Sequence, residues 1–339
     1  MSTTPFAWSL LWRGLASSEA LKTEQTLLDM HVAKWQRRDS AAVGASPKDT
    51  VHSITVEGDG PRELVMLHGM GTGSGIFFRN LAPLSESGLF KRTHAVDWRG
   101  AGLSGRPPWT AASHDEARDF LVDGLEAWRA ENGIERMVLL GHSMGGIVAA
   151  HYAAKHGDRV DHLVLCGPAG VERRPRLYEE GDSVLYDTAT SLWNRGYHPA
   201  AVVRFLGPWG KRLVEAYARR RFDGGRCPLS DGEAHALGAY LHAVNSLPGS
   251  AERSMNQLLG PIAQPVRPLA PLVEALDCPV TFIYGKADWM QPASGAAATR
   301  SRLERGKDGA CVVLPGGGHY IFVEDPPAFL DALLARLKP

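Results

Sequence analysis

The stretch RMVLLGHSMGG, residues 136–146, places an apolar run directly before a Gly-x-Ser-x-Gly turn. A segment of small residues, IVAAHYAAKH, follows at 147–156 and suits a helix. A strand that turns sharply into a helix is the setting in which this motif exposes a serine hydroxyl, and side chains at Gly141 and Gly145 would crowd such a turn. The stretch therefore predicts a nucleophile at Ser143. The alternative is a Gly/Ser turn without chemistry.

Strand-like and helix-like segments alternate on both sides of this turn. The apolar strand candidates are HSITVE at 52–57, ELVML at 63–67, VDHLVLC at 160–166, CPVTFIYG at 278–285 and ACVVL at 310–314. A closing helix, PPAFLDALLARL, is expected at 326–337. Strands that alternate with helices predict an α/β fold, with a mostly parallel sheet and helices on both of its faces.

The alternation divides the chain into four parts. We expect an N-terminal amphipathic helix and linker at 1–49, a first core part at 50–170, a helical cap at 171–268 and a second core part at 269–339. Residues 1–38 read as helical and 39–49 as a polar linker. An interruption of about 100 residues is long for a connection and is typical of a functional lid.

A nucleophilic serine of this kind needs an acid and a base, in the chain order Ser, Asp, His. Asp288 follows the next-to-last predicted strand, and His319 follows the last one. We expect His319 to remove the proton from Ser143 and Asp288 to hold the imidazole. Asp277 is a rival acid, but it precedes its strand and would lie at the other end of the sheet.

The same chemistry needs backbone donors for an oxyanion. We expect them at Met70, in the glycine-rich loop LHGMGTG, and at Met144, where the helix after the nucleophile begins. The mechanism requires no cofactor, and no Cys/His spacing suits a metal.

The N-terminal segment carries an apolar stripe. Trp8, Leu11, Trp12 and Leu15 share one helical face. Indole side chains suit a membrane–water interface, so this face is a candidate membrane contact. The alternative is that the helix docks on the protein's own surface.

Composition limits the partners and the compartment. Lys+Arg and Asp+Glu both number 37, so no overall charge favours nucleic acid. The four cysteines are far apart, no secretory signal is recognisable, and no apolar run reaches the ~18 residues of a membrane span. The expected location is intracellular, either cytoplasmic or peripheral on a membrane or lipid droplet, and a mitochondrial location stays open.

The motifs LHGMGTG, DWRGAGLSGRP, GHSMGG, YGKAD and GGGH together resemble the α/β-hydrolase superfamily. The cap segment YLHAVNSLPGSAERSMNQLL and the C-terminal GGGHYIFVEDP resemble the abhydrolase-domain four/five group. This resemblance implies a serine hydrolase that deacylates phospholipids or lysophospholipids. It also implies two alternatives: a lysophosphatidic acid acyltransferase that uses acyl-CoA, or a lipase co-activator at a lipid surface. The group's His-x4-Asp acyltransferase box corresponds here to His319 with Glu324, followed by Asp325.

The cap is rich in arginine and aromatic residues, notably in ERRPRLY and KRLVEAYARRRF. Arginine binds phosphate bidentately and favours anionic lipid surfaces, although each arginine also suits a solvated helix face. The aromatic residues Trp193, Phe205, Trp209 and Tyr217 either line an acyl pocket or form the cap's own core.

Overall fold

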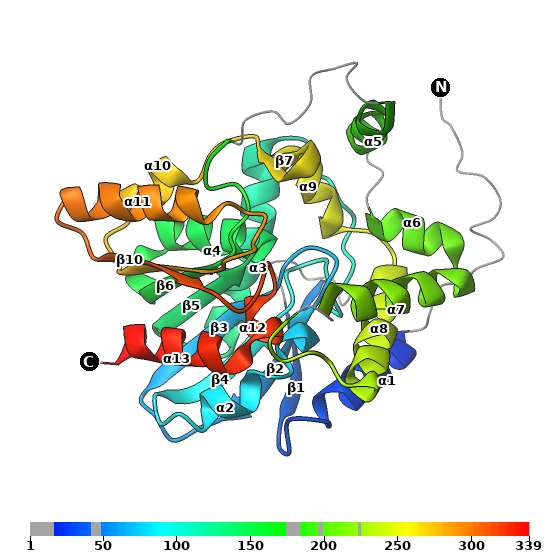
Figure 1. The fold of residues 1–339 in the computed structure, drawn as a ribbon, viewed down its shortest axis with the longest axis horizontal. Helices are drawn as coiled ribbons and strands as arrows, with labels where there is room; N and C mark the ends of the chain where they lie inside the picture. The colour runs from blue at the N-terminus through cyan, green and yellow to red at the C-terminus, as the bar shows by residue number, and fades with distance from the viewer. Residues whose placement is uncertain (1–16, 42–48, 174–183, 196–198, 223–224, 339) are drawn as a thin grey trace.

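The computed structural model describes residues 17–41, 49–173, 184–195, 199–222 and 225–338 of the 339-residue chain. Within these ranges, eight strands form one sheet in the order β1-β2-β4-β3-β5-β6-β9-β10 (Figure 1). The strands are β1 Gln36–Ala41, β2 Thr50–Glu57, β3 Arg62–Leu67, β4 Phe90–Val96, β5 Met137–His142, β6 Val160–Cys166, β9 Val280–Gly285 and β10 Gly309–Leu314. Strand β2 is antiparallel to both neighbours, and the pairs from β4 to β10 are parallel. The mostly parallel sheet predicted from sequence is confirmed.

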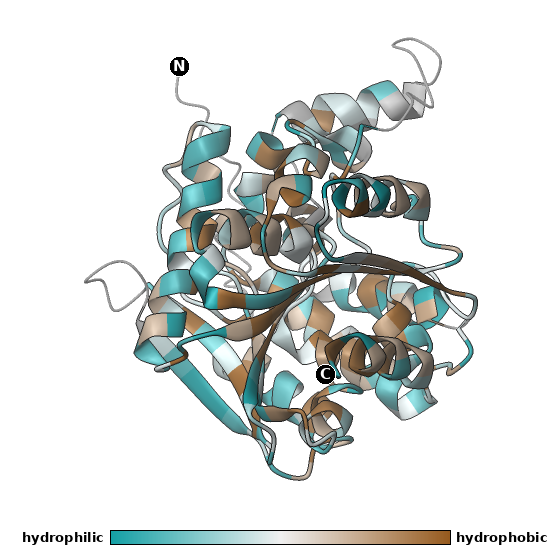
Figure 2. Ribbon diagram, turned by 90° about the vertical axis from the view of Figure 1, so that its left-hand side faces the viewer, coloured by the Kyte–Doolittle hydropathy of each residue, from teal (hydrophilic) through white to brown (hydrophobic). Residues whose placement is uncertain are grey.

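Helices cover both faces of the sheet, which explains why its central strands are apolar along their whole length (Figure 2). One face packs against α3 (His114–Glu131), α4 (Met144–Lys155), α10 (Ala270–Ala275) and α11 (Pro292–Glu304). The other packs against α1 (Ser17–Leu28), α2 (Leu81–Ser85), α12 (Ile321–Glu324) and α13 (Pro326–Leu337). The carboxyl ends of the parallel strands therefore form one edge between two layers of helices, where ligands bind in such sheets.

The N-terminal segment differs from the expectation of helix to residue 38 and a linker over 39–49. Residues 36–41 form β1, which pairs antiparallel with β2 from Gln36↔Thr55 to Ala41↔Thr50. The sequence QRRDSA shows no alternation of apolar and polar residues. It forms a strand all the same, because β1 lies at the edge of the sheet and is stabilised by backbone pairing and side-chain contacts. Helix α1 docks on the protein itself, with Leu27 and Leu28 fully buried. The proposed membrane face, Trp8, Leu11, Trp12 and Leu15, lies outside the described residues.

A buried charged cluster ties this segment to the sheet. His52 of β2 contacts Glu24 of α1 at 3.0 Å and Asp39 of β1 at 2.7 Å. Burial alone lowers the pKa of His52, but the carboxylates of Glu24 and Asp39 outweigh it and raise the pKa to about 10. Imidazolium is thus the form that holds α1 and β1 in place at neutral pH.

Between β6 and β9 lie α5 (Val184–Asn194), α6 (Pro199–Leu206), α7 (Pro208–Phe222), α8 (Asp231–Ser246) and α9 (Met255–Leu258). Helix α8 begins with a capping box formed by Ser230 and Glu233. It also reaches the core, because the Tyr240 hydroxyl accepts a hydrogen bond from the Gly75 amide at 3.0 Å. The domain limits at 50, 171 and 269 stay a prediction. None of the helices in the described ranges combines the length and apolarity needed to cross a bilayer.

Candidate active site

Ser143 occupies the turn between β5 and α4. Its backbone has φ 53° and ψ −117°, a conformation that is strained for a residue with a side chain. A β-carbon on Gly141 would lie 2.4 Å from the Gly145 carbonyl oxygen, and one on Gly145 would lie 2.5 Å from the His68 carbonyl oxygen. Both distances are far below normal contact. The two glycines thus allow the strand, the turn and the neighbouring loop to approach closely enough to present the serine.

The three side chains named from the sequence lie within hydrogen-bonding distance. His319 Nε2 is 3.0 Å from Ser143 Oγ, and His319 Nδ1 is 2.9 Å from Asp288 Oδ1. Asp288 also accepts a hydrogen bond from the Met290 amide at 2.8 Å, which fixes the carboxylate. Asp288 follows β9 and His319 follows β10, at the carboxyl edge of the sheet beside Ser143. All three side chains are largely removed from solvent.

A second histidine, His142, supports the first and was not predicted from the sequence. His142 Nε2–H donates to the His319 backbone carbonyl at 3.0 Å, and the two rings lie 4.7 Å apart. Burial, together with the neighbouring His319, holds the pKa of His142 well below its usual value. The neutral ring is a fixed donor that locates the His319 backbone. Its position next to Ser143 in the motif is the signal that could have identified it.

Met70 and Met144, the expected oxyanion donors, belong to different elements. Met144 is the first residue of α4, where backbone N–H groups have no intrahelical acceptor. Met70 belongs to the turn after β3 and is 37% exposed. That turn is held by Asn245 of α8, whose amide donates to the Gly71 carbonyl at 2.7 Å. Helix α8 thus contacts the loop that carries one of the proposed donors.

Glu324 and Asp325, the carboxylates of the suspected acyltransferase box, have separate surroundings. Glu324 is 3% exposed; its Oε1 accepts from Arg221 of α7 at 2.7 Å, and its Oε2 accepts from the Gly318 amide. Asp325 caps α13 by accepting from the Ala328 amide at 3.4 Å. Both oxygens of Glu324 are therefore engaged in joining the His319 loop to α7.

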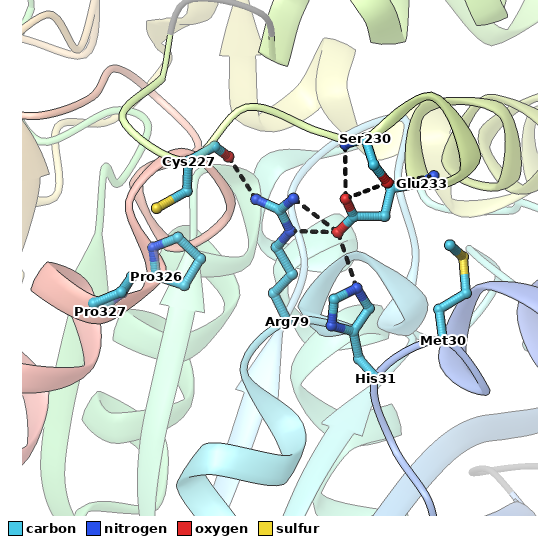
Figure 3. Close-up of a pocket in the computed structure, with 8 residues that line it drawn as sticks. All are labelled: Met30, His31, Arg79, Cys227, Ser230, Glu233, Pro326 and Pro327. Atoms are coloured by element: carbon cyan, nitrogen blue, oxygen red, sulfur yellow. Dashed lines mark hydrogen bonds and ion pairs between the residues drawn. The ribbon is translucent and has the colours of Figure 1, made fainter.

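A cavity of about 560 Å³ lies between the segment that follows α1, the start of α8 and the start of α13 (Figure 3). Its lining residues are Met30, His31, Arg79, Cys227, Ser230, Glu233, Pro326 and Pro327. Arg79 contacts Glu233 at 2.7 Å and donates to the backbone carbonyls of Cys227 and Val323 at 2.6 and 3.0 Å. The guanidinium of Arg79 thus links α8, the segment before it and α12, so we interpret the cavity as a place where these elements meet rather than as a binding site.

Three of the four aromatic residues named between positions 171 and 268 are exposed. Phe205 is 81% exposed, Trp209 76% and Tyr217 47%. Trp193 alone among the four packs against a core cluster. The interpretation of the other three as core residues is therefore wrong, and their role as acyl-pocket residues stays a prediction.

The α/β-hydrolase fold family matches residues 63–326, and the chain belongs to that family. A solved structure with the same fold, carboxylesterase CesB from Bacillus subtilis, has a TM-score of 0.64 and 16% identity, and the match covers 94% of this chain and 97% of that one. The fold and the relatives below support a hydrolase-type enzyme.

Within the family, the relatives include members of the abhydrolase-domain four/five group. A probable 1-acylglycerol-3-phosphate O-acyltransferase from Oryza sativa is 31% identical, with 96% of this chain and 83% of the relative covered. The human (lyso)-N-acylphosphatidylethanolamine lipase is also 31% identical, with 82% and 79% covered. The resemblance stated from the sequence motifs is confirmed.

Proposed function

We propose that the protein is a serine hydrolase that deacylates phospholipids or lysophospholipids. The observation that carries the proposal is the hydrogen-bonded chain from Ser143 through His319 to Asp288, on a strained turn at the carboxyl edge of the sheet. The names of the relatives, a lipase for N-acylphosphatidylethanolamine and an acyltransferase for acylglycerol phosphate, favour a phospholipid as the substrate class.

In the first step, Ser143 Oγ forms a bond to the ester carbonyl carbon while its proton passes to His319 Nε2. Asp288 Oδ1 accepts from Nδ1–H and stabilises the imidazolium. The carbonyl oxygen becomes an oxyanion, which the backbone N–H groups of Met70 and Met144 stabilise. Removing one such donor typically lowers kcat by about 10²–10³-fold.

In the second step, the carbon–oxygen bond to the leaving alcohol breaks, and His319 returns its proton to that alcohol. Water then attacks the acyl-enzyme with His319 as the base, which releases the fatty acid and restores Ser143. The mechanism needs His319 to keep one orientation through two proton transfers. The His142 ring, which binds the His319 carbonyl, contributes to that orientation.

Glu324 acts in this proposal as a positioning residue. It accepts from the amide of Gly318, which directly precedes His319, and it pairs with Arg221 of the cap. The Arg221 guanidinium also lies 5.2 Å from the centre of the Tyr320 ring, directly after His319. One ion pair therefore connects the cap to both neighbours of the base.

The second candidate function is acyl transfer from acyl-CoA to a lysophospholipid such as lysophosphatidic acid. The name of the Oryza relative favours it. The acyl-enzyme would be the same, and a lysophospholipid hydroxyl would replace water as the acceptor. The two functions differ in the product that accumulates when acyl-CoA and lysophosphatidic acid are supplied together.

A fluorophosphonate probe tests the shared first step. We expect it to label the wild-type protein and not Ser143→Ala, because only an activated serine reacts at a useful rate. Ser294→Ala, another buried serine, is the matched control and should label like the wild type. Equal labelling of wild type and Ser143→Ala would exclude the proposed nucleophile.

A further inference from the structure

Helix α7 has two apolar rows: one packs into the core, and the other is exposed, although its Tyr217 side chain also contacts Tyr320. Val214, Ala218 and Phe222 are 8%, 0% and 2% exposed and pack into the core. A second row is formed by Trp209, Leu213 and Tyr217. These three are 76%, 53% and 47% exposed. At four-residue spacing they fall within an arc of about 80° on one face of the helix.

Basic side chains share and flank the exposed row. Helix α7 contains five cations and one carboxylate, in a chain whose formal net charge is zero. Arg212, Arg219 and Arg220 are exposed. By helical position, Arg220 falls between Trp209 and Leu213, and the other two lie along one margin. Arg219 forms an ion pair with Asp231. Arg212 and Arg220 have no ion pair among the described residues.

The preceding helix extends the apolar surface. Helix α6 packs against α7 and carries Phe205, which is 81% exposed, and Val202, which is 50% exposed. Figure 1 shows α6 and α7 at the outer side of the cap, away from α10 and α11. Soluble proteins rarely gather large apolar side chains in this way unless the patch has a partner.

We infer that the outer face of α6 and α7, with Phe205, Trp209 and Leu213, docks on the surface of an anionic lipid bilayer or droplet. Aromatic and aliphatic groups beside arginines are the composition of helices that lie in a membrane interface. The indole of Trp209 suits the boundary between headgroups and acyl chains, and the arginines pair with phosphate. The choice of a lipid rather than a protein partner rests on the proposed function.

The position of the face relative to the catalytic residues agrees with this partner. Arg221, at the C-terminal end of α7, contacts Glu324 and Tyr320 beside His319. Trp289, which is 48% exposed, lies 5.4 Å from the His319 ring between centroids. A lipid surface that binds α7 would therefore lie near the C-terminal end of this helix, which contacts the His319 loop.

Vesicle co-sedimentation tests the docking surface. The probes are vesicles of phosphatidylcholine alone and of phosphatidylcholine with phosphatidylglycerol. We expect Leu213→Ser to weaken binding to both kinds of vesicle about fivefold, and Trp209→Ser added to it more than tenfold. Arg220→Gln should weaken binding only to the anionic vesicles, also about fivefold, and high salt should remove that difference.

Helix α11, on the far side of the sheet, supplies matched controls. The exposed fraction of Leu303 is 56%, which is similar to that of Leu213, and Arg300 is exposed as Arg220 is. Leu303→Ser and Arg300→Gln should bind as the wild type does. Hydrogen exchange of the wild type provides a second measurement that needs no variant, because vesicles should slow exchange of the α7 amides and not of α11.

Four results would overturn the docking surface: no binding of the wild type to anionic vesicles, equal binding of wild type and the α7 variants, equal losses in the α11 controls, or unchanged exchange in α7. Hydrolysis of a soluble short-chain ester is measured on the same samples. Ser143→Ala should bind vesicles normally and lack hydrolysis. Failure of the chemistry is thus separated from failure of the docking.

Discussion

Glu324→Gln separates a positioning role from an acyltransferase role. The substitution keeps the size of the side chain and one oxygen acceptor, but it removes the charge that Arg221 and the Gly318 amide share. A hydrogen bond to a charged group contributes about 1.5–3 kcal/mol, against about 0.5–1.5 kcal/mol for a neutral one. The expected loss is therefore about 1–3 kcal/mol across the two contacts.

That loss should appear in the orientation of His319, because Gly318 directly precedes it. A rise of 1.4 kcal/mol in the barrier lowers the rate tenfold, so kcat should fall about 5–150-fold with little change in KM. The loss should be the same for hydrolysis and for acyl transfer, since both begin with the same acyl-enzyme. Arg221→Gln should give a smaller effect, and the double variant should lose less than the sum of the two.

The assay is steady-state hydrolysis of a soluble ester, with transfer from acyl-CoA to lysophosphatidic acid measured in parallel. Asp325→Asn is the neighbouring control. Asp325 caps α13, so this change should lower the free energy of unfolding by about 1 kcal/mol while kcat stays near the wild-type value. A Glu324→Gln variant that lost transfer and kept hydrolysis would refute the positioning role and support the acyltransferase box.

Three further predictions follow from the same geometry. Asp288→Asn should leave the protein folded and lower kcat about 10⁴-fold, measured on a soluble ester, because Asp288 no longer stabilises the imidazolium. Gly145→Ala places a β-carbon 2.5 Å from the Leu67 and His68 carbonyl oxygens, so both the melting temperature and kcat should fall; an active, equally stable variant would contradict the close packing of the turn. The pKa of His52 is raised from 6.5 to about 10, so its contribution to stability is complete below pH 6.5 and lost as the pH rises through 10. The difference in the free energy of unfolding between wild type and His52→Gln should therefore narrow from pH 7 to pH 10, and a constant difference would contradict the charged cluster.

The parallel sheet could be predicted because buried central strands such as β5 and β9 read as continuous apolar runs between glycine-rich turns. The candidate residues Ser143, Asp288 and His319 could be named because each lies in the loop or turn that follows such a run. Edge strand β1 could not be predicted, since its sequence is polar and it becomes a strand only through its pairing with β2. Because these residues are polar and lack strand alternation, the sequence predicts that the N-terminal helix continues into β1.

Contacts between distant parts of the chain were also beyond the sequence. Glu324 and Arg221 are 103 positions apart, and nothing in either segment indicates that they pair. In α7 the apolar rows at 214 and 218 and at 209, 213 and 217 look equivalent in the sequence. Only packing against α8 and the core decides that the first row is buried, which leaves the second exposed.

The most direct test of the central claim is a lipid mass-spectrometric comparison of the wild type and Ser143→Ala, each incubated with a mixed phospholipid extract. The account predicts that the wild type consumes a phospholipid or lysophospholipid class and releases free fatty acid together with the deacylated product in equal amounts, while Ser143→Ala changes nothing. Phospholipid turnover that persists in Ser143→Ala, or a wild type that leaves every phospholipid class intact, would contradict it.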